Sequence, residues 1–596
     1  MARGTRETVG QNSFQMKVRN SKVPQPSHPG RFSIEKWEDA FSASGPVTDS
    51  DLRLFEAGKW FAPRFLAIAH KASTINFGSL EPDMLVRLHC GLANRNTKVV
   101  RGLGIAPIED RGLVVAQDLI QARYRPEGFL NAAHPTDIIE EVVDGLKYAL
   151  DSLSNGANRK LAPPPGGPEE VLARIQVHIL LGSVFDLYLD LWNSCVWRDW
   201  WVDCSGEVDV VRPDSDGYAV VNEISFYRLK KLNIEYTFHA VGAWKNHLSE
   251  RDKRKFVNPV RVSGLVGSGK NRRMEFVSNV SDLSSAPLSF VMRAASEELY
   301  FSGMLDLKLP KDPRLSLKDL LHAWEALAHL GNVLNERLPS GEEVGSIQRL
   351  AEFCPTLSLD ELLMVIQRSM GCSAGLAQSL LGFFVLDTTG RDERSKGESS
   401  EVWHRPLLKL RNGRFAPVLT ALTAPNIHRS IEYWTRAGGL NLQDRGPLFE
   451  SEARGQLAWA IARSSLSDHS GVVRQNLVVP CLDGPEEIDL AFWVGNTLLI
   501  GEAKCMMLPV LPHGEFNYYK TLIEAAGQIK RKCKKIQEQL QDSLSHIPRP
   551  GGWMPELTKV VPFVLTSTPL GVGLVVDSIP VVDVRMLRNF FARGGD

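Results

Sequence analysis

The sequence predicts a multidomain α+β protein. We expect a largely helical N-terminal region, a strand-containing middle part, and a C-terminal α/β domain with a central mixed sheet flanked by helices. The length supports several domains, because 596 residues at roughly 150 residues per domain give about three or four units. Apolar residues at helical spacing dominate residues 34–153, whereas from residue 446 onward helices alternate with short apolar strands.

The composition is that of an ordinary soluble protein, with 43% hydrophobic and 23% charged residues. Lys+Arg and Asp+Glu number 69 each, so binding to nucleic acid or to a membrane surface would need a local patch. The eight cysteines form no CxxC pair, which disfavours a structural zinc site and a disulfide framework. This cysteine usage favours a reducing cytoplasm.

We expect no segment of this sequence to enter a membrane. The first 20 residues lack the apolar stretch of a secretory signal. The most apolar helical segment, residues 177–201, carries Asp186, Asp190 and Arg198. Charges inside such a segment favour a buried helix of a soluble protein over a membrane span.

Breaks in composition divide the chain into five expected segments. Residues 1–32 are polar, with six Lys or Arg against Glu7, and predict a disordered basic arm. A solvated tail is the simpler interpretation of this arm, and contact with nucleic acid is the alternative. The other segments are a helical domain (33–153), a mixed α/β domain (169–310), a helical region with a hairpin (311–445) and the C-terminal domain (446–596).

Residues 358–386 predict two helices joined by a short turn, and Asn412-Gly413 predicts a hairpin with a type I′ turn. Together these elements would form a winged-helix-like DNA-binding module. Two packed helices beside an unrelated hairpin are the commoner arrangement, and both interpretations stay open.

A glycine-rich motif at residues 264–271 has the GxxxxGK spacing of a phosphate-binding P-loop. Asn271 replaces the Ser or Thr that would hold Mg²⁺, and the following residues do not predict a helix. We therefore expect a flexible loop here in preference to a nucleotide site.

Residues 486–505 predict a β-hairpin. Gly495-Asn496 forms its two-residue turn, with Gly first as a type II′ turn prefers. The turn fixes the register of four charged residues, which face each other as two pairs: Asp489 opposite Glu502, and Glu487 opposite Lys504. Period-two alternation places these four side chains on one face, while the other face would pack through Ile488, Leu490, Phe492 and Val494.

The predicted pair of Asp489 and Glu502 indicates a cation site. Directly opposed residues have Cβ atoms about 4.5–5.5 Å apart, so the two carboxylates would repel each other. Burying them without a partner costs free energy, and a divalent cation between them would remove that cost. Hard oxygen ligands suit Mg²⁺, and Lys504 would reach the same site to orient an attacking water. The alternative is a surface hairpin with weak ion pairs such as Glu487–Lys504.

This pattern, Asp489 followed after twelve residues by Glu502-Ala503-Lys504, resembles the signature of the PD-(D/E)XK nuclease superfamily. The likeness covers residues 446–596 and includes the order helix, strand, hairpin, long helix, strand of the restriction-endonuclease-like fold. Ile488 stands where the family pattern has proline.

The resemblance implies an endonuclease that hydrolyses phosphodiester bonds, with DNA favoured over RNA. It also implies Mg²⁺ or Mn²⁺ as the cofactor, held by groups of Glu450, Asp489, Glu502 and Ala503. Glu452 is the weaker candidate on the helix that carries Glu450. In this family pattern Lys504 positions the nucleophile, and Gln528 on the following helix supports the nucleophile or the substrate.

The helix after the hairpin is locally basic. Its apolar stripe leaves five cations as candidates for binding nucleic-acid phosphates: Lys530, Arg531, Lys532, Lys534 and Lys535. A solvated helix face is the equal alternative.

The second function hypothesis is a non-catalytic nucleic-acid-binding or assembly protein on a nuclease-like scaffold. In either case we expect the N-terminal region to sense or position a target, bind a partner protein or form a homo-oligomer. Such an architecture resembles that of prokaryotic antiviral defence effectors, by analogy alone.

Overall fold

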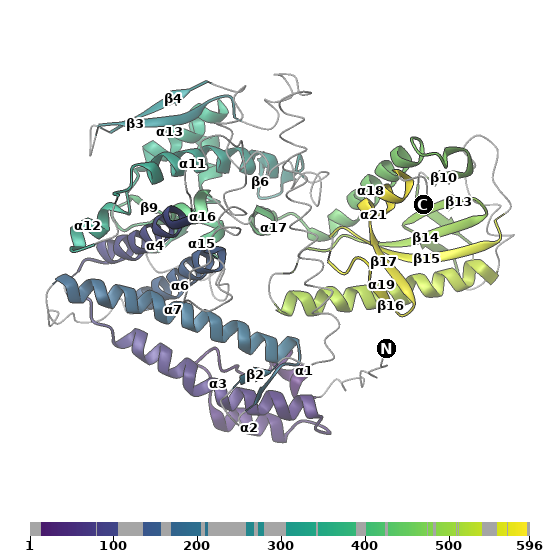
Figure 1. The fold of residues 1–596 in the computed structure, drawn as a ribbon, viewed down its shortest axis with the longest axis horizontal. Helices are drawn as coiled ribbons and strands as arrows, with labels where there is room; N and C mark the ends of the chain where they lie inside the picture. Colours follow the sequence, from purple (N-terminus) through teal and green to yellow (C-terminus); the bar gives the residue numbers. More distant parts are fainter. Residues whose placement is uncertain are drawn as a thin grey trace. The chain divides into compact units, whose positions relative to one another are not determined.

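The computed structural model in Figure 1 describes residues 13–78, 80–104, 135–155, 168–203, 209–211, 258–267, 272–278, 305–340, 344–388, 401–423, 427–473, 475–480, 484–507, 509, 512–538, 557–568 and 570–592. The chain forms two compact units. The first comprises residues 1–213, 240–293 and 318–437, and the second comprises residues 214–239, 294–317 and 438–596. The predicted mixed domain, 169–310, is therefore divided between the two units, and the C-terminal unit is larger than the predicted 446–596.

The first unit is mainly helical. Its helices are α1 (Phe14–Arg19), α2 (Ile34–Ser42), α3 (Asp49–Thr74), α4 (Pro82–Gly104), α6 (Pro135–Asn155), α7 (Pro168–Trp197), α11 (Leu317–Glu336), α12 (Ile347–Glu352), α13 (Leu359–Met370), α14 (Ala374–Leu381), α15 (Glu401–His404), α16 (Leu419–Thr423) and α17 (Ile427–Ala437). Its strands are short: β1 (Trp201–Asp203), β2 (Asp209–Val211), β3 (Arg261–Val266), β4 (Arg273–Val277), β7 (Val385–Asp387), β8 (Leu407–Lys409) and β9 (Phe415–Pro417).

Part of the predicted disordered arm is ordered. Ser13 caps α1 by accepting a hydrogen bond from a backbone amide of its first turn. Phe14 and Val18, one turn apart on α1, are fully buried in an aromatic-rich core formed with α2, α3 and α7. The prediction for residues 13–32 is therefore wrong, because two apolar residues at i, i+4 spacing anchor a short helix once a core is available to receive them. Residues 1–12 lie outside the described residues.

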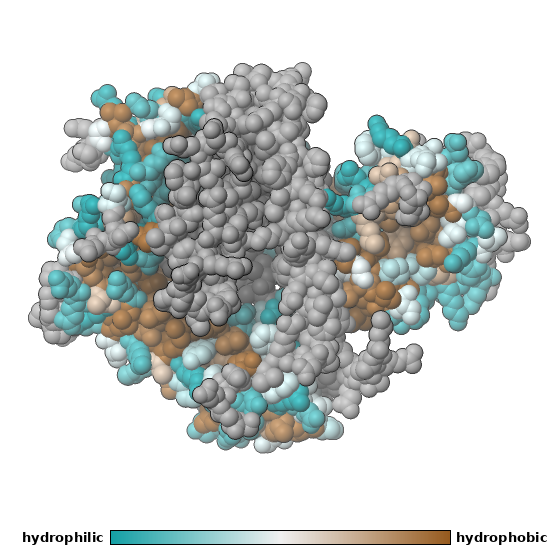
Figure 2. All heavy atoms as spheres, in the orientation of Figure 1, coloured by the Kyte–Doolittle hydropathy of each residue, from teal (hydrophilic) through white to brown (hydrophobic). Residues whose placement is uncertain are grey.

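Helix α7 combines length with an apolar composition. By length and composition alone its residues Glu169–Trp197 are able to cross a bilayer, and 33% of the apolar window is buried. A core helix of a soluble protein passes the same test, and α7 packs against α3 and α6. Its surface still carries exposed Val177, Leu180 and Leu187. Figure 2 shows hydrophobic residues, in brown, on this face of the molecule. The absence of a membrane segment stays a prediction.

Helices α13 and α14 form the predicted helix–turn–helix, and β8 and β9 form the predicted hairpin. The hairpin turn differs from the type I′ prediction. Leu410 pairs with Arg414 across a three-residue loop, in which Gly413 alone has a positive φ, 78°. Asp83 on α4 accepts hydrogen bonds from two amides of this loop, so the tip of the hairpin is held within the first unit. Winged-helix DNA binding stays a prediction.

The glycine-rich motif lies in the β3–β4 hairpin. Gly264 belongs to β3, and the strand β4 follows the motif where a P-loop would have a helix. Residues 268–271 lie outside the described residues. The strand that follows stands where a P-loop would have a helix, and the absence of a nucleotide site stays a prediction.

The second unit is built on a six-stranded mixed sheet with helices on both faces (Figure 1). The strand order is β10-β13-β14-β15-β17-β16, in which β14, β15 and β17 are parallel and the other neighbours are antiparallel. The strands of this sheet are β10 (Ser470–Val472), β13 (Leu490–Val494), β14 (Thr497–Lys504), β15 (Lys559–Thr566), β16 (Val575–Val576) and β17 (Ile579–Asp583). Two separate pairs belong to the same unit: β5 (Lys308–Leu309) with β6 (Asp312–Ser316), and β11 (Leu477–Val479) with β12 (Glu486–Ile488).

Among the described residues, the sheet is covered by the helices α18 (Arg445–Ile461), α19 (Pro512–Glu538) and α21 (Val584–Ala592). The long helix α19 covers one face, and α18 and α21 cover the other. Leu498 and Ile500 on β14 pack into the α19-side core, whereas Ala503 packs on the α18 side. By the same alternation Glu502 lies on the α19 side. A Cβ at Gly501 would lie 2.5 Å from the ring of Phe563 on β15, so glycine is required just before Glu502.

Candidate active site

The predicted hairpin register is confirmed where β13 and β14 pair. Val494 lies opposite Thr497, and Leu490 lies opposite Gly501. Gly495 has a φ of 56°, the positive value that a type II′ turn requires at its first central residue. The pairing ends at Leu490, one residue before the first predicted acid pair.

The predicted first strand of the hairpin is interrupted at Asp489. The sequence predicted no such break. The preceding strand β12 leaves the sheet and pairs with β11, placing Glu487 opposite Val478. The prediction that Glu487 faces Lys504 is therefore wrong. Arg454 on α18 stabilises the break, because its guanidinium donates to the Asp489 carbonyl at 2.6 Å.

The break also changes which core the residue before it joins. Ile488 is buried in the α19-side core, whereas Leu490 and Phe492 are buried on the α18 side. The prediction that these three residues share one face is therefore wrong. A bend of one residue resets the period-two alternation on which that prediction depended.

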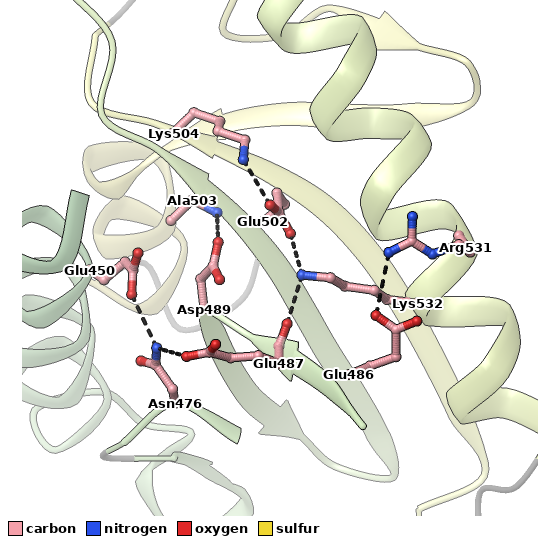
Figure 3. Close-up of polar contacts among 10 residues, drawn as sticks. All are labelled: Glu450, Asn476, Glu486, Glu487, Asp489, Glu502, Ala503, Lys504, Arg531 and Lys532. Atoms are coloured by element: carbon pink, nitrogen blue, oxygen red, sulfur yellow. Dashed lines mark hydrogen bonds and ion pairs between the residues drawn. The ribbon is translucent and has the colours of Figure 1, made fainter. Parts of the chain in front are cut away.

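The carboxylates of Asp489 and Glu502 nevertheless share one site (Figure 3). Asp489 Oδ2 accepts a hydrogen bond of 2.8 Å from the backbone amide of Ala503, directly beside Glu502. Burial raises the pKa of Asp489, and the negative charge of Glu502 raises it further. The sequence thus predicted that Asp489 and Glu502 lie close together. The hydrogen bond from the Ala503 amide to the Asp489 side chain, and not backbone pairing across the hairpin, brings them together.

Glu502 is buried and is held by two lysines. Lys504 Nζ donates to Oε1 at 2.8 Å, and Lys532 Nζ on α19 donates to Oε2 at 2.7 Å. Lys532 Nζ also donates to the backbone carbonyl of Glu487 at 2.6 Å, which ties β12 to the end of β14. Lys504 therefore reaches the site as predicted, and Lys532 is part of the same constellation.

Lys532 has a role that the sequence analysis missed by grouping it with surface cations. It lies three residues after Ile529 and four before Ile536, both fully buried on the α19 stripe. This spacing places a lysine on the buried face of the helix, and a buried ammonium requires an acidic partner. The signal was therefore present in the sequence.

Glu450 on α18 approaches the site from the other side (Figure 3). Burial raises the pKa of Glu450, and the neighbouring charge of Asp489 raises it further. Asn476 donates to Glu450 at 3.4 Å and to Glu487 at 2.6 Å, linking the two carboxylates. Asn476 and Arg454 were not predicted, because neither belongs to a local motif. Glu452 is exposed on the same helix and bonds to Gln456.

Gln528 lies on α19, one helical turn before Lys532. Its Oε1 is buried, and no hydrogen-bond partner among the described residues reaches it. A buried amide oxygen without a partner costs free energy, which suits a group that meets a ligand. The proposed supporting role of Gln528 stays a prediction.

The remaining cations of the predicted phosphate-binding cluster have acidic partners within the chain. These pairs are Lys530–Asp577 at 2.9 Å, Arg531–Glu486 at 3.4 Å, Lys534–Glu538 at 3.9 Å and Lys535–Glu486 at 2.9 Å. The hydrogen bond from Lys535 is the main cause of a lowered pKa of Glu486. The exposed pairs Lys530–Asp577 and Lys534–Glu538 contribute under about 1 kcal/mol, so phosphates would compete with these two at little cost. Phosphate binding by this cluster stays a prediction.

The donor set fits a hard cation without forming a complete cage. Among the described residues, no group of three or more His, Cys, Asp or Glu side chains lies ready to hold a metal ion. Mg²⁺ requires less, because one or two carboxylates with waters commonly hold it. Asp489 and Glu502 supply those carboxylates. Burial and a neighbouring carboxylate raise the pKa of both Asp489 and Glu450, and a bound cation would favour their ionised forms.

Comparisons of the chain with protein-family models, with curated proteins and with solved structures found no match.

Proposed function

We propose that the second unit is a Mg²⁺- or Mn²⁺-dependent endonuclease with a restriction-endonuclease-like fold. It would hydrolyse phosphodiester bonds of nucleic acid, DNA in preference to RNA. The observation that carries this proposal is the acid pair. Asp489 and Glu502 are brought together beside Lys504 at the end of β14, although the two negatively charged carboxylates repel each other. The repulsion between the two carboxylates is unfavourable for the fold, whereas a bound cation would offset it.

Each residue of the site has a proposed role in holding the cation, the attacking water or the substrate. Asp489, Glu502 and the Ala503 carbonyl would hold the cation, with Glu450 completing the acidic side. The bound cation supplies an acidified water and neutralises phosphate charge. Lys504 is placed to hold the attacking oxygen by a hydrogen bond, because its ammonium already lies at the Glu502 carboxylate. Gln528 would offer the buried amide oxygen that has no partner among the described residues.

Cleavage of supercoiled plasmid DNA tests the proposal. We expect nicking or linearisation by the full-length protein with Mg²⁺ or Mn²⁺ and none in EDTA. Lys504→Ala is expected to lower the rate by about 10²-fold or more, since it removes a charge next to the reacting groups. Lys520→Ala is the matched control, because Lys520 is an exposed lysine on α19 that pairs with exposed Glu524 on its own helix. Cleavage that persists in EDTA or in Lys504→Ala would refute the proposal.

A second candidate function, non-catalytic nucleic-acid binding or assembly on this scaffold, has one observation in its favour. Both carboxylate oxygens of Glu502 already have lysine partners. DNA binding that is insensitive to EDTA, without cleavage under any condition, would favour this candidate. For the first unit we propose that it senses or positions the target, binds a partner protein or forms a homo-oligomer. We also propose a cytoplasmic location and, by analogy, a role in antiviral defence.

A further inference from the structure

Lys532 differs from the other cations of α19 in its burial and in its partner. Its side chain is 11% exposed, against 79% for Lys534, 52% for Lys530 and 25% for Lys535. Its partner, Glu502, is a candidate cation ligand, whereas the partners of the other three lie outside the acid pair. Lys532 is therefore the α19 cation whose position bears directly on the site.

The contacts of Lys532 fix its ammonium in place. The Nζ atom lies between Glu502 Oε2 at 2.7 Å and the Glu487 carbonyl at 2.6 Å, as Figure 3 shows. Leaving this position would break the bonds of the ammonium to the Glu487 carbonyl and to buried Glu502, which costs free energy. Lys504 is 27% exposed and carries its charge at the rim, so it can turn towards solvent.

We propose that Lys532 is a tethered counter-ion of Glu502 that competes with the divalent cation and thereby sets the cation concentration at which the site fills. This inference rests on the proposed metal site. An ammonium and a divalent cation on the same carboxylate lie within about 4–6 Å of each other and repel strongly where solvent is largely excluded. The cation therefore binds against the charge of Lys532, and the affinity of the site is lower than its carboxylates alone would give.

The competing explanation is that Lys532 only holds Glu502 in the orientation that a cation needs. The two explanations predict opposite results for a neutral side chain of similar length. Lys532→Met keeps the apolar stem in the α19 stripe but removes the charge. If Lys532 competes, this variant binds cation more tightly; if it orients Glu502, the variant binds more weakly.

The test measures Mn²⁺ binding to the full-length protein by electron paramagnetic resonance of unbound Mn²⁺, without nucleic acid. We expect Lys532→Met to lower the Kd by about ten-fold or more, because the repulsion removed exceeds what a ten-fold change requires. Lys532→Arg keeps the charge and is expected to keep the weak wild-type affinity. Lys535→Met is the matched control on the same helix, and it should leave the Mn²⁺ affinity within about two-fold of wild type.

Glu502→Gln, combined with Lys532→Met, is expected to abolish the gain, which shows that the tighter binding occurs at Glu502. An equal or higher Kd in Lys532→Met overturns the inference. A second variant, Lys532→Gln, and a thermal melt of each protein guard against misfolding. Because this test measures Mn²⁺ binding and not cleavage, the counter-ion inference and the nuclease proposal can fail independently. Tighter Mn²⁺ binding without cleavage in any variant supports the counter-ion and refutes the nuclease. Cation-dependent cleavage with unchanged Mn²⁺ affinity in Lys532→Met supports the nuclease and refutes the counter-ion.

Discussion

Replacing Glu502 with glutamine tests whether its two lysine contacts hold the end of β14 in place. Glutamine keeps the size of the side chain and one acceptor oxygen but loses the charge. Glu502 is 7% exposed, so water cannot replace the lost contacts without opening the structure. Lys532 would keep its Glu487 carbonyl, while Lys504 would turn towards solvent.

The size of the effect follows from the two contacts. Hydrogen bonds to a charged group contribute about 1.5–3 kcal/mol each, and neutral ones about 0.5–1.5 kcal/mol. Exchanging two bonds between oppositely charged groups, one of them partly solvated, for one bond from an ammonium to a neutral amide oxygen costs about 3 kcal/mol. Relief of the repulsion between Glu502 and Asp489 offsets about 1 kcal/mol of this loss. We expect a net loss of about 2 kcal/mol in the stability of β14.

Native-state hydrogen exchange on the full-length protein in EDTA measures the local stability of β14. We expect the β14 amides of Glu502→Gln to exchange about 30-fold faster, the equivalent of about 2 kcal/mol. Glu524→Gln is the matched control. Glu524 and its partner Lys520 are 60% and 64% exposed, so it should cost under about 1 kcal/mol. Equal effects of the two substitutions would refute the assignment of the buried charge pair.

Two further predictions concern the acid pair and the N-terminal helix. Asp489→Asn is expected to raise the melting temperature at neutral pH in EDTA, because burial and Glu502 raise the pKa of Asp489 and so disfavour its ionised form in the fold. This gain should shrink as the pH falls through the raised pKa towards the ordinary 3.8; a gain that grows on acidification would contradict it. Phe14→Ala is expected to release α1 at a cost of about 3–5 kcal/mol and to increase limited proteolysis there, unlike Lys22→Ala at an exposed position. Equal proteolysis of the two variants would show that α1 is not anchored by Phe14.

Local patterns in the sequence predicted much of the second unit. The Gly495-Asn496 turn fixed the register of β13 and β14, because only a residue that tolerates positive φ suits that turn. The register then placed Asp489 near Glu502, and the spacing of charges placed Lys504 beside them. The order of helices and strands after residue 446 also followed from periodicity. Each of these features depends on residues close together in the chain.

Other features could not be derived from local patterns. The strand break at Asp489 depends on Arg454, which lies 35 residues earlier and reaches the freed carbonyl. The pairing of β12 with β11 and the bridge through Asn476 likewise follow from packing between elements. A period-two pattern continues smoothly through residue 489, so the sequence predicts one strand where the structure has two.

The sequence by itself therefore determined the carboxylates and the lysine of the candidate site, together with the turn that brings them near each other. The tertiary structure decided that Lys532 points into the site, that Glu487 leaves it and that Phe14 anchors an ordered helix. The physical reason is that turn chemistry and periodicity are local. The burial of a charge or of a short apolar helix depends on which distant surface is available to pair with it.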